Sequence, residues 1–155
     1  MIQRIQTLYL LAVVVLSAIT LFSPLVEFFN STSALSYVMN YKGVYQILET
    51  GNLFQNDVWT LTVLSAIIPL ITLVTIFLFK KRLLQLRLTF FNTVLMAGWY
   101  AMLFIYIWFA KANLNADWTL EIVTAFPLIN IILNLLAIRG IGKDEALVKS
   151  LNRIR

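Results

Sequence analysis

Four long stretches without a charged residue limit what this chain can fold into more than any other feature. They run from Ile5 to Val26, Val58 to Phe79, Leu88 to Ala110 and Ile122 to Ile138. At a rise of about 1.5 Å per residue, roughly 20 residues of helix cross the 30 Å hydrocarbon core of a bilayer. Because unbonded backbone amides are costly in lipid, each stretch is predicted to be a membrane-spanning helix.

The composition agrees with a membrane protein and removes several kinds of chemistry. Apolar residues make up 61% of the 155 residues and charged residues 12%, against roughly 45–50% and 25% in soluble domains. The chain has neither Cys nor His, which excludes disulfides, thiolate nucleophiles, His-dependent catalysis and Cys- or His-ligated metals. We therefore expect no cofactor, no metal site and no enzymatic activity.

The sequence predicts an all-α fold, a single membrane domain over residues 1–155 built as an integral membrane four-helix bundle. Extending the short fourth stretch through Gly140 and Ile141 gives predicted spans over residues 5–26, 58–79, 88–110 and 122–141. Residues 27–57 then form an outer loop and residues 142–155 a cytoplasmic tail. The lipid bilayer is the first partner that this arrangement implies.

Within the outer loop, residues 34–48 fit either a strand or a helix. Tyr37 and Met39 alternate as in a strand, whereas Tyr37, Tyr41 and Tyr45 recur at helical spacing. Gly43 separates two apolar runs and favours a short hairpin lying on the outer end of the bundle. A cap over the bundle is the favoured role for this aromatic loop, and a partner site is the alternative.

Lys and Arg residues are distributed very unevenly between the two sides. Ten of the twelve lie in the N-terminal segment, the second connection and the tail, whereas the other side has only Lys42 and Lys111. By the positive-inside rule both termini are predicted to be cytoplasmic. Basic residues beside membrane spans have this topological explanation, and no nucleic-acid-binding module accompanies them, so we expect no nucleic-acid partner.

The tail is predicted to be an amphipathic helix lying along the cytoplasmic surface. Leu147, Val148, Leu151 and Ile154 share one stripe. Its basic residues, candidates for contact with lipid headgroups or with a protein partner, are Lys143, Lys149, Arg153 and Arg155.

None of the four stretches contains a charged residue, so the intramembrane candidates are uncharged. Spacings of three and four residues place several polar residues on single helix faces. They are Thr62, Ser65, Thr72, Asn92, Asn130 and Asn134. Close helix packing and interhelical hydrogen bonding form the favoured interpretation. The alternative is a narrow polar path between spans 2 and 4, in which Pro24, Pro69 and Pro127 kink the helices.

Aromatic residues divide into two groups by depth. Trp59, Trp108 and Trp118 fall near the outer ends of spans, as expected of interface anchors. Trp99 and Tyr100 lie mid-span, where we expect packing, with the Tyr100 hydroxyl bonded to a neighbouring helix.

Four carboxylates, Glu27, Asp57, Asp117 and Glu121, share the outer rim. They are loosely spaced and match no metal-binding pattern, so a cation site there has little support.

Three segments carry a resemblance to a known family. They are the opening from Met1 to Leu11, the connection from Phe79 to Leu88 and the closing run from Ala137 to Val148, which includes Lys-Asp-Glu-Ala-Leu-Val. The chain resembles, over essentially its whole length, a family of small four-span membrane proteins of the Bacteroidota that has only a domain-of-unknown-function label. The resemblance implies a Gram-negative inner-membrane location and brings no assigned activity.

Two functions fit these observations. The favoured hypothesis is an accessory or scaffold subunit of a membrane complex, which implies a membrane-protein partner or self-association. The alternative is a component that translocates a small solute, an ion or a lipid along the polar path between spans 2 and 4.

Overall fold

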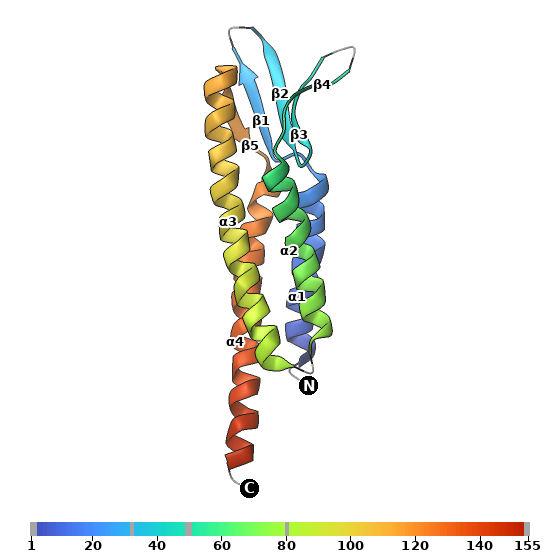
Figure 1. Ribbon diagram of the computed structural model, residues 1–155, viewed down its shortest axis with the longest axis vertical. Coiled ribbons are helices and arrows are strands. Elements are labelled where there is room, and N and C mark those ends of the chain that lie inside the picture. The colour runs from blue at the N-terminus through green and yellow to red at the C-terminus, as the bar shows by residue number, and fades with distance from the viewer. Residues whose placement is uncertain (1–2, 32, 49–50, 80, 154–155) are drawn as a thin grey trace.

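The computed structural model describes residues 3–31, 33–48, 51–79 and 81–153. Within them the chain forms four long helices and five short strands (Figure 1). The helices are α1 (Gln3–Phe22), α2 (Trp59–Phe77), α3 (Arg82–Leu114) and α4 (Phe126–Arg153), with the short 3-10 helix η1 (Ile122–Ala125) before α4. The strands are β1 (Val26–Asn30), β2 (Leu35–Asn40), β3 (Gly43–Gln46), β4 (Leu53–Asn56) and β5 (Asp117–Leu120).

All four helices are long and apolar enough to cross a membrane, judged by length and composition. Their outward faces carry large apolar side chains, and Leu8, Leu70, Phe90 and Leu128 are each more than half exposed. In water such a surface would drive association, whereas lipid covers it without a hydrophobic penalty.

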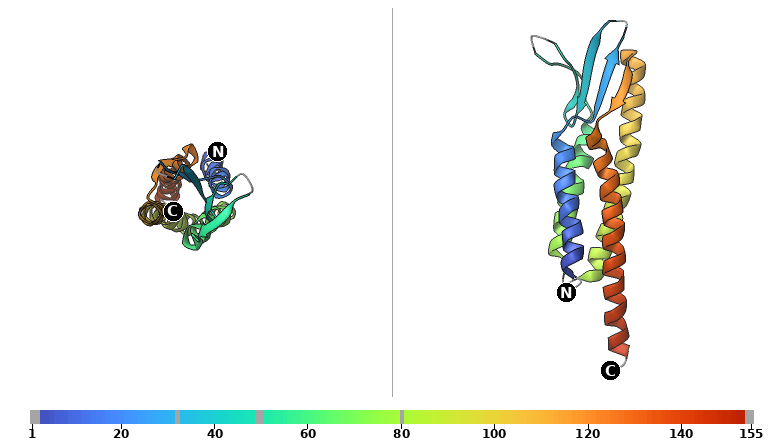
Figure 2. Two further views of the ribbon diagram at one scale, coloured as in Figure 1. Left: turned by 90° about the horizontal axis from the view of Figure 1, so that it is seen from above. Right: turned by 180° about the vertical axis from the view of Figure 1, so that it is seen from behind.

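The helices stand around the bundle in chain order. α1 packs against α2 and α4, and α3 packs against the same two helices, as the view from above shows (Figure 2). α2 and α4 therefore occupy opposite corners. Every helix contributes to the core, since Val13, Leu61, Met96 and Ala137 are fully buried.

The all-α prediction is wrong, because a five-stranded antiparallel sheet covers one end of the bundle. Its strand order is β4-β3-β2-β1-β5. β2 and β3 pair as a hairpin within residues 34–48. The outer loop also supplies β1 and β4, and the second outer connection supplies β5. The chain is therefore a helical bundle with a β cap, not a bundle with one small hairpin.

The sheet was missed because its strands are short and because β1 and β5, which pair, lie far apart in the sequence. In β1, Val26 and Phe28 are buried while Glu27 is exposed, so the strand begins inside the first uncharged stretch and continues past its charged end. All four residues of β5 are exposed, which leaves no alternating pattern to read. β5 is held by pairing with β1, where Trp118 lies opposite Phe28, and that pairing joins segments far apart in the sequence.

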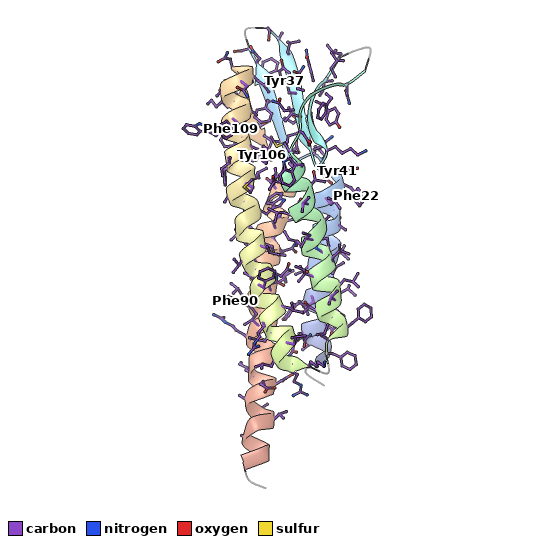
Figure 3. All side chains as sticks on the ribbon, in the orientation of Figure 1. Phe22, Tyr37, Tyr41, Phe90, Tyr106 and Phe109 are labelled. Carbon is purple, nitrogen blue, oxygen red and sulfur yellow. The ribbon has the colours of Figure 1, made fainter. Side chains whose placement is uncertain are left out.

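The outer half of α3 supports the sheet. α3 has 33 residues, which at 1.5 Å per residue exceeds the hydrocarbon thickness by about 20 Å. Leu103 and Ile107 of α3 belong to the same buried cluster as Phe28 and Met39 of the sheet. Phe109, by contrast, points away from the fold (Figure 3). The long helix thus provides one wall of a second core outside the bundle.

Two polar contacts connect the sheet to the helices. Asn30 at the end of β1 donates a 2.8 Å hydrogen bond to the carbonyl of Leu114, in the last turn of α3. The hydroxyl of Thr62 in α2 donates to the carbonyl of Tyr41, in the β2–β3 turn. Both contacts satisfy carbonyls that regular secondary structure leaves free.

The tail also differs from its prediction. α4 continues without a break to Arg153 and extends past the ends of the other helices, parallel to the bundle (Figure 1). Gly140 allows α1 to come close, since a Cβ there would lie 3.0 Å from the Cγ of Gln6. The tail is therefore an extension of α4 instead of a separate helix lying across the bundle end.

Substituting Gly43 tests the packing of the sheet. A Cβ at this position would lie 2.5 Å from the backbone oxygen of Asn56 and 2.5 Å from the Phe54 ring. We expect Gly43→Ala to lower the free energy of unfolding by about 1–3 kcal/mol, measured by thermal unfolding in detergent. Gly98→Ala is the matched control, because nothing lies within 4 Å of its Cβ position. Equal effects of the two substitutions would contradict the β3–β4 contact.

Candidate functional site

Buried polar side chains from all four helices gather in the middle of the bundle. We call this set the polar core, and it consists of Ser17, Thr20, Ser65, Thr72, Asn92, Asn130 and Asn134, none more than 6% exposed. Spacings of three, four and seven residues on α1, α4 and α2 turn these side chains to the same side of each helix. The polar core contains five of the six residues predicted as a polar stripe.

Each of the three asparagines in the polar core donates a hydrogen bond from its amide nitrogen to a side chain on a neighbouring helix. Asn92 Nδ2 on α3 donates to Thr72 Oγ1 on α2 at 2.8 Å, and Asn130 Nδ2 on α4 donates to Ser17 Oγ on α1 at 3.0 Å. Asn134 Nδ2 makes a weaker contact with a sulfur, Met96 Sδ, at 3.5 Å. These bonds link three of the four pairs of neighbouring helices.

Trp99 bonds to the polar core, whereas Thr62 does not. The indole Nε1 of Trp99 donates to Ser65 Oγ at 2.7 Å, which gives a buried donor its acceptor. Thr62 stands apart from the polar core, since it is half-buried and bonds to Tyr41 at the outer end. The sequence did not indicate that Trp99 bonds to the polar core, because an indole in a span is ordinarily an apolar packing group.

Three carboxamide oxygens in the polar core have no hydrogen-bond partner among the described residues: the Oδ1 atoms of Asn92, Asn130 and Asn134. A buried acceptor without a donor costs about 1–3 kcal/mol. In a membrane this cost persists unless a ligand or a water supplies the donor.

A small cavity lies where the four helices meet. Its volume is about 20 Å³, and each helix contributes two lining residues: Ser17 and Thr20, Ser65 and Ile68, Met96 and Trp99, Pro127 and Asn130. α2 and α4 face each other across this cavity without packing side by side. At this size the space accommodates about one water molecule, so the described conformation has no open path for a larger solute here.

The Tyr100 hydroxyl hydrogen-bonds to the backbone at the start of α4. Pro127 is the second residue of α4, and the first turn of a helix tolerates proline. It therefore does not kink the interior of a helix, which is what the sequence had suggested. The Tyr100 hydroxyl donates to the carbonyl of Thr124 at 2.5 Å and accepts from the N–H of Leu128 at 3.0 Å. One hydroxyl thus bridges a carbonyl and an N–H four residues apart, the pair that a helical hydrogen bond would join directly.

The opposite end of the bundle has its own polar contact. Gln6 Nε2 on α1 donates to Asp144 Oδ2 on α4 at 2.9 Å, and Arg82 Nη1 on α3 lies 3.4 Å from the Asp144 carbonyl. Gln6 and Asp144 both lie in segments that carry the family resemblance, but nothing in the sequence indicated that their side chains meet. Farther along α4, Leu147 and Val148 are exposed.

The remaining predicted residues lie at the periphery. Trp59, Trp108 and Trp118 are exposed near the sheet end, and Lys143 is exposed on the α4 extension. Arg155 and the side chains of Lys149 and Arg153 lie outside the described residues. Among the described residues, no three acidic groups come together as a metal site. Asp117 instead pairs with Lys111 at 3.9 Å.

The comparisons with known proteins place the chain in one family. The family model described as "Domain of unknown function (DUF4293)" matches residues 2–154. No curated protein matches the chain. The expected likeness to a domain-of-unknown-function family is thus confirmed across nearly the whole chain.

Removing the Tyr100 hydroxyl tests its bridging role. Tyr100→Phe leaves the Thr124 carbonyl and the Leu128 N–H without this partner, and we expect the free energy of unfolding to fall by about 1–3 kcal/mol. Tyr106→Phe is the matched control, because its hydroxyl makes a single 3.2 Å bond to Thr60 Oγ1 and should cost about 0.5–1 kcal/mol. Denaturant unfolding in detergent measures both, and equal losses would contradict the bridge.

Proposed function

The chain belongs to the DUF4293 family, and we propose that it is an accessory or scaffold subunit of a protein complex in the inner membrane of a Gram-negative bacterium of the Bacteroidota. Its binding element in this proposal is the extension of α4 beyond Asp144. The bundle holds that extension, and the β cap lies on the opposite, periplasmic side.

The exposed apolar part of the extension is the observation that carries the proposal. Ile141 is buried against the bundle, whereas Leu147 is 57% and Val148 is 38% exposed. The sequence continues the same stripe with Leu151 and Ile154. Outside the bilayer such a stripe favours burial in the groove of another helical protein. Lys143 beside it is exposed and offers a positive charge to a protein surface.

The proposed orientation rests on charge. The N-terminus, the α2–α3 connection and the α4 extension share one end of the molecule, opposite the sheet (Figure 1). Ten of the twelve basic residues lie in or beside these segments, namely Arg4, those from Lys80 to Arg87 and those from Arg139 to Arg155, which favours a cytoplasmic location for that end. A partner of the α4 extension is accordingly cytoplasmic or has a cytoplasmic part.

Translocation of a small solute or ion is the second candidate. The three unpaired asparagine oxygens of the polar core favour it, because they offer acceptors to a polar ligand at membrane depth. The 20 Å³ volume at the bundle centre counts against it in this conformation. Catalysis is not part of either proposal.

Reporter fusions test the orientation. A reporter enzyme that is active only in the periplasm should be silent when fused after Arg155 and active when fused to a chain truncated after Asp57. A reporter that fluoresces only in the cytoplasm should give the opposite pattern. The reverse result for both fusions would overturn the proposed topology.

A pair of neighbouring substitutions tests the docking role. Leu147→Glu places a charge on the exposed stripe, whereas Ala146→Glu places the same charge on the adjacent, also exposed, position outside it. Cross-linking in native membranes followed by affinity purification should recover a partner with the wild type and with Ala146→Glu. The Leu147→Glu variant should lose most of the recovered partner. Removing a central anchor residue from an interface typically weakens binding by about 2 kcal/mol, which is about 30-fold in affinity. Recovery of the wild type without any cross-linked partner would refute the proposal.

A further inference from the structure

The cavity in the polar core has the size and the polarity of a site for one water molecule. Its volume of about 20 Å³ exceeds the roughly 10–15 Å³ that a single water requires. Its lining residues include three hydroxyl side chains and one carboxamide, all buried. A cavity lined by apolar groups stays dry, whereas one with two to four polar partners holds water.

Two of the hydroxyl groups have a hydrogen to donate. Ser17 Oγ accepts a hydrogen bond from Asn130, and Ser65 Oγ accepts one from Trp99. Within the described part of the chain, neither serine hydroxyl donates to a protein acceptor. Both serines line the cavity, so each can donate to an oxygen placed there.

The other two polar groups are acceptors. Thr20 uses its hydrogen in a 2.9 Å bond to the Leu16 carbonyl, which leaves its oxygen lone pairs available. Asn130 is 1% exposed, and its Oδ1 has no partner. Rotating this amide by half a turn would exchange oxygen for nitrogen and leave an unbonded donor instead, so the protein alone cannot satisfy both amide atoms.

We propose that one water molecule occupies this cavity and connects three helices. It accepts hydrogen bonds from Ser17 and Ser65 and donates to Asn130 Oδ1 and Thr20 Oγ1, which matches the two donors and two acceptors of water. A metal cation would use the acceptors alone and would leave both serine hydrogens unbonded. No carboxylate lines the cavity to balance a cationic charge. The water site does not depend on the proposed scaffold function.

Asn134 provides a control within the same helix. It lies one turn from Asn130, is fully buried and has an equally unpaired Oδ1. It does not line the cavity, so no water should reach it. The two residues therefore differ in access to the cavity while sharing residue type, helix and burial.

Magnetisation transfer from water in solid-state NMR tests the proposal on the full-length protein in lipid bilayers. Transfer should reach the side-chain amide of Asn130 and that of the exposed Asn113, and it should be absent for Asn134. The signal should persist when choline replaces sodium and potassium in the buffer. Transfer to Asn130 that is as weak as at Asn134 would overturn the proposal, and transfer that appears only in choline would assign the site to a cation instead.

Filling the cavity gives an independent check. Ser65→Thr keeps the hydroxyl that accepts from Trp99 and adds one methyl group to a space of about one water. Transfer to Asn130 should then fall to the level of Asn134, while Asn113 is unchanged. Transfer that is unaffected in the folded variant would place the water elsewhere and refute this site. If the variant fails to fold, the wild-type comparison of Asn130 with Asn134 decides alone.

Discussion

The arrangement of the helices depends on the free-energy cost of placing a hydrogen-bonding group without a partner in an apolar environment. Neighbouring helices avoid that cost by bonding to one another: Asn92 bonds to Thr72, Asn130 to Ser17 and Trp99 to Ser65. Tyr100 extends the same principle to the backbone by bridging Thr124 and Leu128. Lipid contributes no hydrophobic attraction between helices, so these bonds and close packing determine which faces meet.

A different balance holds around the sheet, which lies outside the bilayer in the proposed topology. There the sheet gains stability in the usual way, by removing Phe28, Met39 and Val44 from water against the outer half of α3. The single helix α3 therefore takes part in two cores with different physics, a polar network among the helices and an apolar cluster beneath the sheet. Its length of 33 residues follows from this double role.

The helical part could be predicted from the sequence because long charge-free stretches indicate helices that are apolar enough to cross a membrane. The gathering of Ser65, Thr72, Asn92, Asn130 and Asn134 at the axis follows from their spacing. The sheet could not be predicted, since β5 depends on a partner strand far away in the chain and has no pattern of its own. Trp99 and Tyr100 were visible as mid-span aromatics, but their exact acceptors depend on the rotation of α2 and α4.

The pairing of β1 with β5 also sets an order for biogenesis. β1 follows the first helix, whereas β5 lies between the third and the fourth. In the proposed topology, β1 therefore reaches the far side of the membrane during synthesis with one edge unpaired, and it stays so until α3 has been inserted. Unpaired edges attract other chains, so the interval between these two insertion events is the period in which the nascent protein is most exposed to misassembly. Final closure of the β cap must be among the last steps of assembly.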